Sequence, residues 1–164
     1  MTTIGLISDT HGFLNPRVLA FFVSCDEIWH AGDIGSPTTL HALQAYKPTR
    51  AVYGNIDGTE VRHVCPETLV FRVEDIRVAM IHIGGYPGRY SAMARKMITE
   101  EKPALFVCGH SHILKVIYDK KHEVLTLNPG AAGNSGFHQM VTALRFKIEG
   151  DMIFDMEIFE QSRS

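Results

Sequence analysis

The sequence predicts an α/β protein with two layers of sheet at its core and helices on the outside. Three observations support this class. Short apolar runs alternate with amphipathic helices in the first half, strand-like runs joined by turns fill most of the second half, and polar residues follow five of the buried runs. Alternating strands and helices favour a sheet covered by helices. At 164 residues the chain is about one domain long, so we expect a single domain over residues 1–164.

Three strands and two helices are expected in the first third of the chain. The runs 3–8, 27–31 and 50–53 are short and apolar, as strands buried on both faces are. Helices are predicted to begin at Asn15-Pro16 and Ser36-Pro37, where a capping side chain precedes a proline. Apolar residues at helical spacing follow each start: Val18, Leu19, Phe22 and Val23, then Leu40, Leu43 and Tyr46. This order of elements predicts parallel strands.

The rest of the chain reads mainly as strands and turns. Residues 68–73 and 77–83 flank a turn and form a predicted hairpin. A helix is expected over 90–101, with Met93, Met97 and Ile98 on one side. A buried strand over 104–108 and two further strand pairs complete the prediction, formed by 115–118 with 123–127 and by 140–148 with 152–159.

Composition excludes several functional classes. The chain has 18 acidic and 16 basic residues, a formal charge of −2, which argues against a dedicated nucleic-acid or anionic-membrane surface. No apolar run approaches the ~20 residues that span a bilayer, and the first residues do not resemble a signal peptide. The three cysteines form no C-x-x-C pair, so we expect a reducing, cytoplasmic setting. The sequence does not determine the oligomeric state, and a homodimer or larger assembly is open.

Polar side chains stand where each buried run ends. Asp9 and His11 follow the first run, Asp33 follows the second and Asn55 the third. Two later strands lead into the other members of the set: His82, His110 and His112. In open α/β sheets ligands bind beyond the carboxyl ends of the strands. We therefore expect these seven side chains to meet in space.

The chemistry of the set predicts a metal centre. Asp, Asn and His supply oxygen and imidazole ligands without cysteine, which suits Mn²⁺, Fe, Zn²⁺ or Mg²⁺. Asp9 and His11 are two residues apart, so on an extended segment they share one side. Seven donors exceed the need of one ion that keeps positions for water and substrate. Two ions sharing a bridging carboxylate use them better, and Asp33 is the expected bridge.

These residues resemble the successive motifs of the calcineurin-like metallophosphoesterases, written D-x-H, GD, GN, H and GHxH. The resemblance covers roughly residues 3–133. The segments Gly54-Asn55-Ile56-Asp57 and Asn128-Pro129-Gly130 are similar to the family's compact bacterial and archaeal phosphodiesterase branch. The resemblance implies a four-layer α/β/β/α sandwich.

The resemblance also implies ligands and a reaction. One metal would be held by Asp9, His11, Asp33 and His112, and the other by Asp33, Asn55, His82 and His110. The implied enzyme is a phosphodiesterase in which a hydroxide bridging two divalent ions attacks a small phosphodiester or phosphomonoester. Manganese is favoured, with iron, nickel, zinc or magnesium open. Asp33, Asn55 and His82 would be the catalytic residues.

Several positions depart from the family pattern. Ile56 stands where many relatives have the histidine that protonates the leaving group, which predicts a preference for good leaving groups or an acid from elsewhere. His138 is the spare histidine to test as that acid. Asp57 is expected to orient a metal-bound histidine or to shape a turn. His30 is expected to be a core or supporting residue.

A second function remains open at this point. A binding or scaffold module could keep the fold and do little catalysis, and a retromer subunit with this fold is a family precedent. The isoleucine at position 56, with Gly84, Ile113 and Ala131 at other positions that are often polar, favours that alternative. The complete ligand set favours the enzyme.

Overall fold

The computed structural model describes residues 1–163, and within that range two five-stranded sheets pack face to face. The first sheet has the order β10–β9–β1–β2–β3, formed by Met152–Ser162, Met140–Glu149, Thr2–Ile7, Glu27–His30 and Thr49–Ala51. The second has the order β4–β5–β6–β8–β7, formed by Thr68–Val73, Ile76–Ile81, Leu105–Val107, Val124–Pro129 and Leu114–Asp119. Strands β1, β2 and β3 run parallel, as do β5, β6 and β8.

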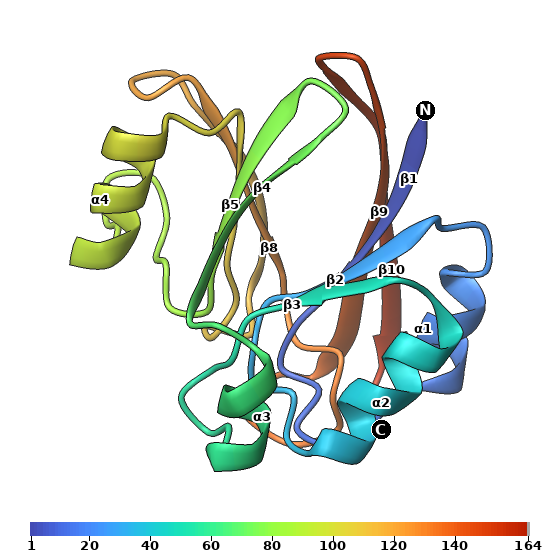
Figure 1. Cartoon of the computed structure of the whole chain (residues 1–164). Helices are drawn as coiled ribbons and strands as arrows, with labels where there is room; N and C mark the ends of the chain where they lie inside the picture. The colour runs from blue at the N-terminus through green and yellow to red at the C-terminus, as the bar shows by residue number, and fades with distance from the viewer. Residues whose placement is uncertain (164) are drawn as a thin grey trace.

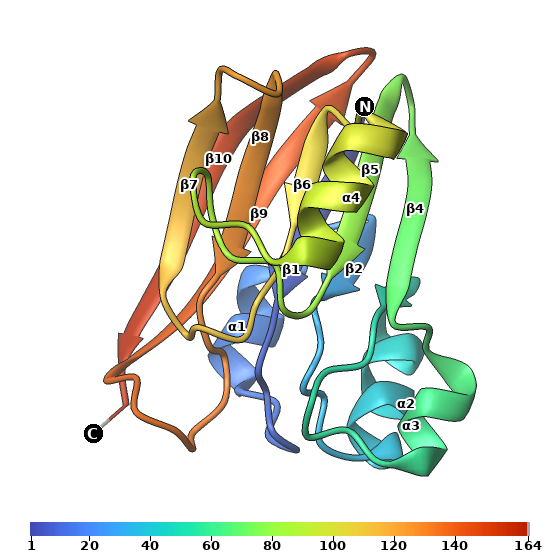
Figure 2. The same ribbon diagram turned by 90° about the vertical axis from the view of Figure 1, so that its left-hand side faces the viewer.

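Helices cover the outer faces of both sheets (Figure 1). Helices α1 (Pro16–Phe21) and α2 (Pro37–Tyr46) lie against the first sheet, and α4 (Ala92–Glu101) lies against the second, as Figure 2 shows from the side of α4. The short helix α3 (Thr59–Val64) packs beside α2 at the end of the sandwich. This arrangement confirms the predicted α/β/β/α sandwich.

The alternation of side chains along each strand builds the layers. In β1, Ile4 and Leu6 point between the sheets, whereas Ile7 faces the cluster that includes Phe22 after α1. Trp29 of β2 is fully buried and meets Phe146 of β9 edge to face, with ring centroids 5.7 Å apart. Both faces of the central strands are therefore dry, which explains their short apolar sequences.

Four local features differ from expectation. The third strand ends at Ala51 rather than at residue 53, because Tyr53 N–H donates to the carbonyl of Pro66 instead of to β2. Val23 lies beyond the end of α1 and is 65% exposed, and Met93, expected on the buried side of α4, is 44% exposed. Helix α3 was missed, because Gly58 provides no side-chain cap and only Val61 is buried.

The three cysteines form no disulfide bond, and the helices are short. Cys25, Cys65 and Cys108 are buried and free, and burial raises the pKa of the Cys108 thiol to about 12. Within residues 1–163 the longest helices have ten residues each, so no described helix has the length to cross a bilayer.

Removing the Phe146 ring, which lies between the sheets, should destabilise the protein. Phe146 is fully buried, so Phe146→Ala is expected to lower the free energy of unfolding by about 3–5 kcal/mol. Ile158→Ala, at a side chain that is 49% exposed, should change it by less than about 1 kcal/mol. Urea denaturation of both variants measures this, and equal losses would contradict the assigned core.

Candidate metal centre

The loops that follow the parallel strands continue the backbone hydrogen bonding between neighbouring strands of each sheet. Backbone N–H groups of Asp9 and His11 donate to the carbonyls of Gly32 and Asp33, both over 3.0 Å. In the second sheet, Gly109 N–H donates to the carbonyl of His82 over 2.9 Å. The motif loops are thus extensions of neighbouring strands, which places their side chains at one end of the sandwich.

Six of the seven predicted ligands form two compact groups. In each group the potential ligand atoms lie within 4.8 Å of one another; the groups are Asp9, His11 and His112, and Asp33, His82 and His110. The seventh residue joins the second group, since Asn55 Oδ1 lies 3.0 Å from His110 Nδ1. Every group combines residues from both sheets. The structure therefore brings all seven residues together, and their role as metal ligands stays a prediction.

Both carboxylates face histidines of both groups. Asp33 Oδ2 lies 3.5 Å from His11 Nε2 and 3.3 Å from His82 Nε2. Asp9 Oδ1 lies 3.2 Å from His112 Nε2, and 3.7 and 3.8 Å from the Nε2 atoms of His11 and His82. The Asp33 position between the groups is compatible with the expected bridge. Asp9 is also central, which the sequence did not indicate.

Several buried polar atoms of this centre accept or donate no hydrogen bond. Within residues 1–163, four buried side-chain polar atoms make no hydrogen bond, and three are Asp9 Oδ1, His11 Nε2 and His82 Nε2. Two other carboxylate oxygens accept hydrogen bonds within the protein: Asp9 Oδ2 from Ser8 Oγ, and Asp33 Oδ1 from Ile56 N–H. Orphaned buried polar groups are costly, so cations fit these positions.

The tautomer of His82 also suits a metal. Its Nδ1 lies 2.7 Å from the carbonyl oxygen of Ala31, which can only accept, so Nδ1 carries the hydrogen. Nε2 is then left to face the two carboxylates. A hydrogen bond to the second ring nitrogen is the usual way in which a ligating histidine is oriented.

The charges of the centre favour bound cations. Burial opposes the charged form of His82, but the Asp33 and Asp9 carboxylates outweigh it and raise the pKa of His82. Burial likewise acts to raise the pKa of Asp33, but its contacts with His82 and Ile56 N–H lower that pKa overall. Asp33 is therefore ionised at neutral pH. A metal at His82 Nε2 would therefore compete with a proton for that atom.

The backbone at these ligands is strained. Five of the seven residues have φ between 49° and 73°, in the left-handed region: Asp9, His11, Asp33, His110 and His112. Within residues 1–163 the other non-glycine residues in this region lie in hairpin turns, a bulge and a helix end. Each such conformation costs roughly 1–2 kcal/mol, and strain of this kind gathers at functional sites.

Two glycines allow the motif loops to approach one another. A Cβ on Gly54 would collide with the Asp33 carboxylate, and a Cβ on Gly109 would collide with Ser8 Oγ and Asp9 Oδ2. The glycines of the GN and GH motifs are thus required by close packing against the ligands of other loops.

Asp57 ties two motif loops together. Its carboxylate is buried and accepts backbone N–H groups of Ile34, Gly35 and Gly54 over 2.8–3.1 Å. Of its two expected roles, the structure shows the turn-shaping one. All three partners of the Asp57 carboxylate are backbone N–H groups, and none is a histidine.

Two supporting residues carried little or no signal in the sequence. Asn128 donates to the Gly109 carbonyl and to Ser111 Oγ, so it fixes the loop that carries His110 and His112. The Asn-Pro-Gly segment was the only clue to this role. Ser8 donates to Asp9 over 2.6 Å, and no feature of the sequence around it indicated this role.

His30 is buried and neutral. Its Nδ1 accepts from Gly32 N–H, and its Nε2 pairs with Thr10 Oγ1 over 2.9 Å. Burial lowers the pKa of His30 to about 3. This histidine therefore fastens the first two motif loops from inside, as the supporting role predicted.

Three exposed isoleucines form an apolar rim beside the predicted ligands. Ile56, Ile83 and Ile113 each follow a predicted ligand and are 48%, 44% and 57% exposed. None can move a proton. His138, the proposed substitute acid, lies behind His112, with Nδ1 of the two rings 3.2 Å apart. Burial lowers the pKa of His138.

The two-sheet fold carries two Asp–His groups that could each hold a metal ion. A model of the calcineurin-like phosphoesterase superfamily domain matches residues 2–151. The chain belongs to that superfamily. A protein from Methanothermobacter thermautotrophicus, named a probable metallophosphoesterase, is 32% identical over 136 residues, which cover 78% of this chain and 76% of the relative.

Solved structures share the fold. Vps29 from Chaetomium thermophilum superposes with a TM-score of 0.77 at 12% identity, covering 99% of both chains. Zinc-bound Vps29 from Entamoeba histolytica gives 0.72 at 14% identity, again over 99% of each. A Streptococcus pneumoniae protein described as a phosphoesterase by prediction gives 0.69 at 22%, covering 99% of this chain and 90% of that one. At these identities the likeness establishes the fold alone.

Acid should destabilise the protein partly through His30. Its pKa falls from 6.5 in the unfolded chain to about 3 in the folded one, so between those values only the unfolded state takes up the proton. Stability is then lost as the pH falls from about 6.5 toward 3, by up to about 1.4 kcal/mol per pH unit.

The measurement is urea denaturation of chelator-treated protein between pH 7 and pH 4. His30→Gln keeps a donor for Thr10 but cannot titrate, so its stability should fall less steeply with acid. Parallel curves for the wild type and the variant would refute the assignment to His30.

Proposed function

We propose that this protein is a metal-dependent phosphodiesterase that hydrolyses small phosphodiesters at the centre formed by the seven strand-end residues. The observation that carries the proposal is the Asp33 carboxylate, with Oδ2 3.5 Å from a histidine of one group and 3.3 Å from a histidine of the other. A carboxylate placed between two groups of ligands is suited to bridge two adjacent cations. Membership of the superfamily supports the reaction type.

The charge of the centre suits a phosphate anion. Asp9 and Asp33 contribute −2, while Asn55 and neutral histidines contribute nothing. Two divalent cations would bring +4, which leaves a net positive charge of 2 before a hydroxide binds. When bound, such a pair supplies a hydroxide near neutral pH and neutralises charge on the phosphate.

The residues of the chain position these charges and the substrate. The strained loops hold the ligand atoms in place, so little reorganisation is needed. Asn55 and His82 line a pocket of about 340 Å³ whose other walls include Ile83, Met93 and Tyr53. We place one ester substituent of the substrate there. A partly apolar wall fits a diester with an aromatic or other apolar group.

The loss of hydrolysis in ligand variants tests this function. Mn²⁺ should stimulate hydrolysis of bis(4-nitrophenyl) phosphate, and Asp33→Asn or His112→Ala should reduce kcat/KM by about 100-fold or more, because each removes a ligand or a bridging charge. His63→Ala, at an exposed histidine outside the predicted ligand set, should leave kcat/KM unchanged. Activity that survives both ligand changes would rule the proposal out.

Ile56 sets a limit on the substrate. Its side chain is 48% exposed beside Asn55 and cannot protonate a leaving group, so only esters with good leaving groups should react rapidly. Ile56→His should raise kcat/KM little for bis(4-nitrophenyl) phosphate, which has a good leaving group. For an alkyl phosphodiester it should raise kcat/KM by about 10-fold or more, because general acids matter most for poor leaving groups. The matched variant Ile56→Asn introduces polarity without an acid and should give no gain. Equal effects of both variants would count against the missing-acid interpretation.

A binding module with little catalysis is the second candidate. The exposed apolar rim formed by Ile56, Ile83 and Ile113 favours it, since such a rim could contact a protein partner. The intact ligand set counts against it. Occupancy by two metals without turnover of any diester or monoester in a broad panel would select this alternative.

A further inference from the structure

His138 stands directly behind a predicted metal ligand. It lies in the loop between β8 and β9, and its Nδ1 is 3.2 Å from Nδ1 of His112. The two rings meet edge to face, with centroids 5.1 Å apart. On its other side, His138 Nε2 lies 2.7 Å from the carbonyl oxygen of Gly133.

These two contacts determine where the hydrogens lie. The Gly133 carbonyl can only accept, so His138 Nε2 carries a hydrogen and donates it. In a neutral ring His138 Nδ1 is then an acceptor, and the hydrogen between the rings belongs to His112 Nδ1. The lone pair of His112 therefore sits on Nε2, the atom that faces Asp9 Oδ1 over 3.2 Å.

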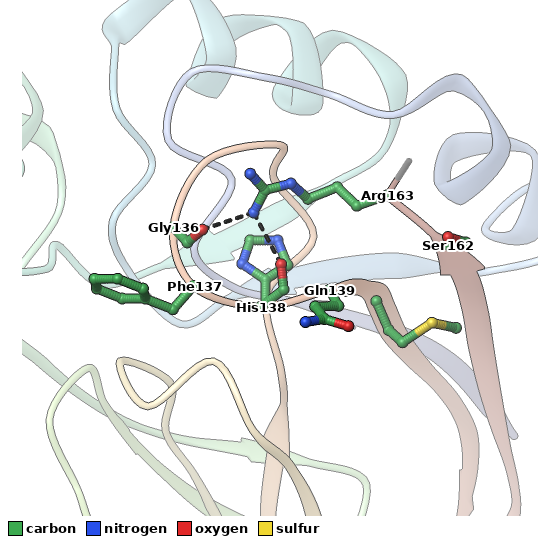
Figure 3. Close-up of a pocket in the computed structure, with 7 residues that line it drawn as sticks. Gly136, Phe137, His138, Gln139, Ser162 and Arg163 are labelled. Carbon is green, nitrogen blue, oxygen red and sulfur yellow. Dashed lines mark hydrogen bonds between the residues drawn. The ribbon is translucent and has the colours of Figure 1, made fainter.

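The loop that carries His138 is fixed from outside. Arg163 Nη1 donates to the carbonyl oxygens of Gly136 and His138 over 2.7 and 2.8 Å, as Figure 3 shows. Gly136 has a φ of +119°, and a Cβ there would come within 2.7 Å of the His112 ring. Only glycine lets this loop lie so close to the ligand.

We propose that His138 is a positioning residue for the metal held by Asp9, His11 and His112. It holds His112 in the tautomer that leaves Nε2 free to bind a metal. Because Gly133 and Arg163 fix the position of His138, His138 in turn fixes the orientation of the His112 ring. This inference rests on the proposed metal centre. It replaces the role of substitute acid, because both ring nitrogens of His138 are engaged within the protein.

Two conservative variants distinguish a role of His138 in positioning His112 from a role that only stabilises the loop through Gly133. His138→Asn can place an amide oxygen near the position of Nδ1, so it keeps an acceptor for His112 but loses the bond to Gly133. His138→Gln can place an amide N–H near the position of Nε2, so it keeps the bond to Gly133 but loses the acceptor. His63→Gln, at an exposed histidine, is the control.

The readout is Mn²⁺ binding by isothermal calorimetry, with thermal unfolding of the metal-free proteins alongside. Loss of the partner of a ligating histidine weakens metal binding by about 10–100-fold. We expect that loss for one of two sites in His138→Gln, and a loss of less than about 3-fold in His138→Asn, with similar metal-free melting temperatures.

Two results would overturn the inference. One is wild-type Mn²⁺ affinity at both sites in His138→Gln. The other is a loss in His138→Asn that equals or exceeds the loss in His138→Gln, because that order indicates a purely structural loop contact to Gly133. If the wild-type protein binds no Mn²⁺, the proposed function itself fails, which is a different outcome from either of these.

Discussion

The site depends on carboxylate and imidazole atoms that are buried against one another without protein partners. Asp9 Oδ1 and the Nε2 atoms of His11 and His82 lie at the junction of the two sheets and make no hydrogen bond. Such atoms oppose folding unless protons or cations lie between them. Because each candidate group takes ligands from both sheets, bound cations would also join the two layers. Such cations would couple the stability of the fold to the chemistry of the site.

The rest of the molecule maintains this unfavourable arrangement. The dry core between the sheets, with Trp29 and Phe146 at its centre, holds the strands rigidly enough for the left-handed conformations at their ends to persist. A second set of buried polar residues then fastens the loops to one another. His30 links the first two motif loops, Asp57 links the second to the third, and Asn128 fixes the last. These bonds within the protein therefore position the predicted ligands.

The sequence indicated the fold and the members of the site because both leave local patterns. Buried parallel strands are short apolar runs, and the ligands follow them directly, as Asp33 follows β2. What the sequence could not indicate depends on contacts between distant segments. The bond from His138 to His112 spans 26 residues, and the left-handed backbone of His112 has no signature in its residue type. Helix α3 and the exposure of Met93 were misjudged because they depend on which surfaces neighbouring elements cover.

The central claim is that two cations share the Asp33 carboxylate at the junction of the sheets. The most direct measurement is a crystal structure of protein soaked in Mn²⁺, with anomalous differences that locate the metal. We expect two peaks about 3.5–4 Å apart, one beside His11 and His112 and one beside His82 and His110, with Asp33 bound to both. A single peak, or an Asp33 carboxylate beyond bonding distance of either ion, would contradict it.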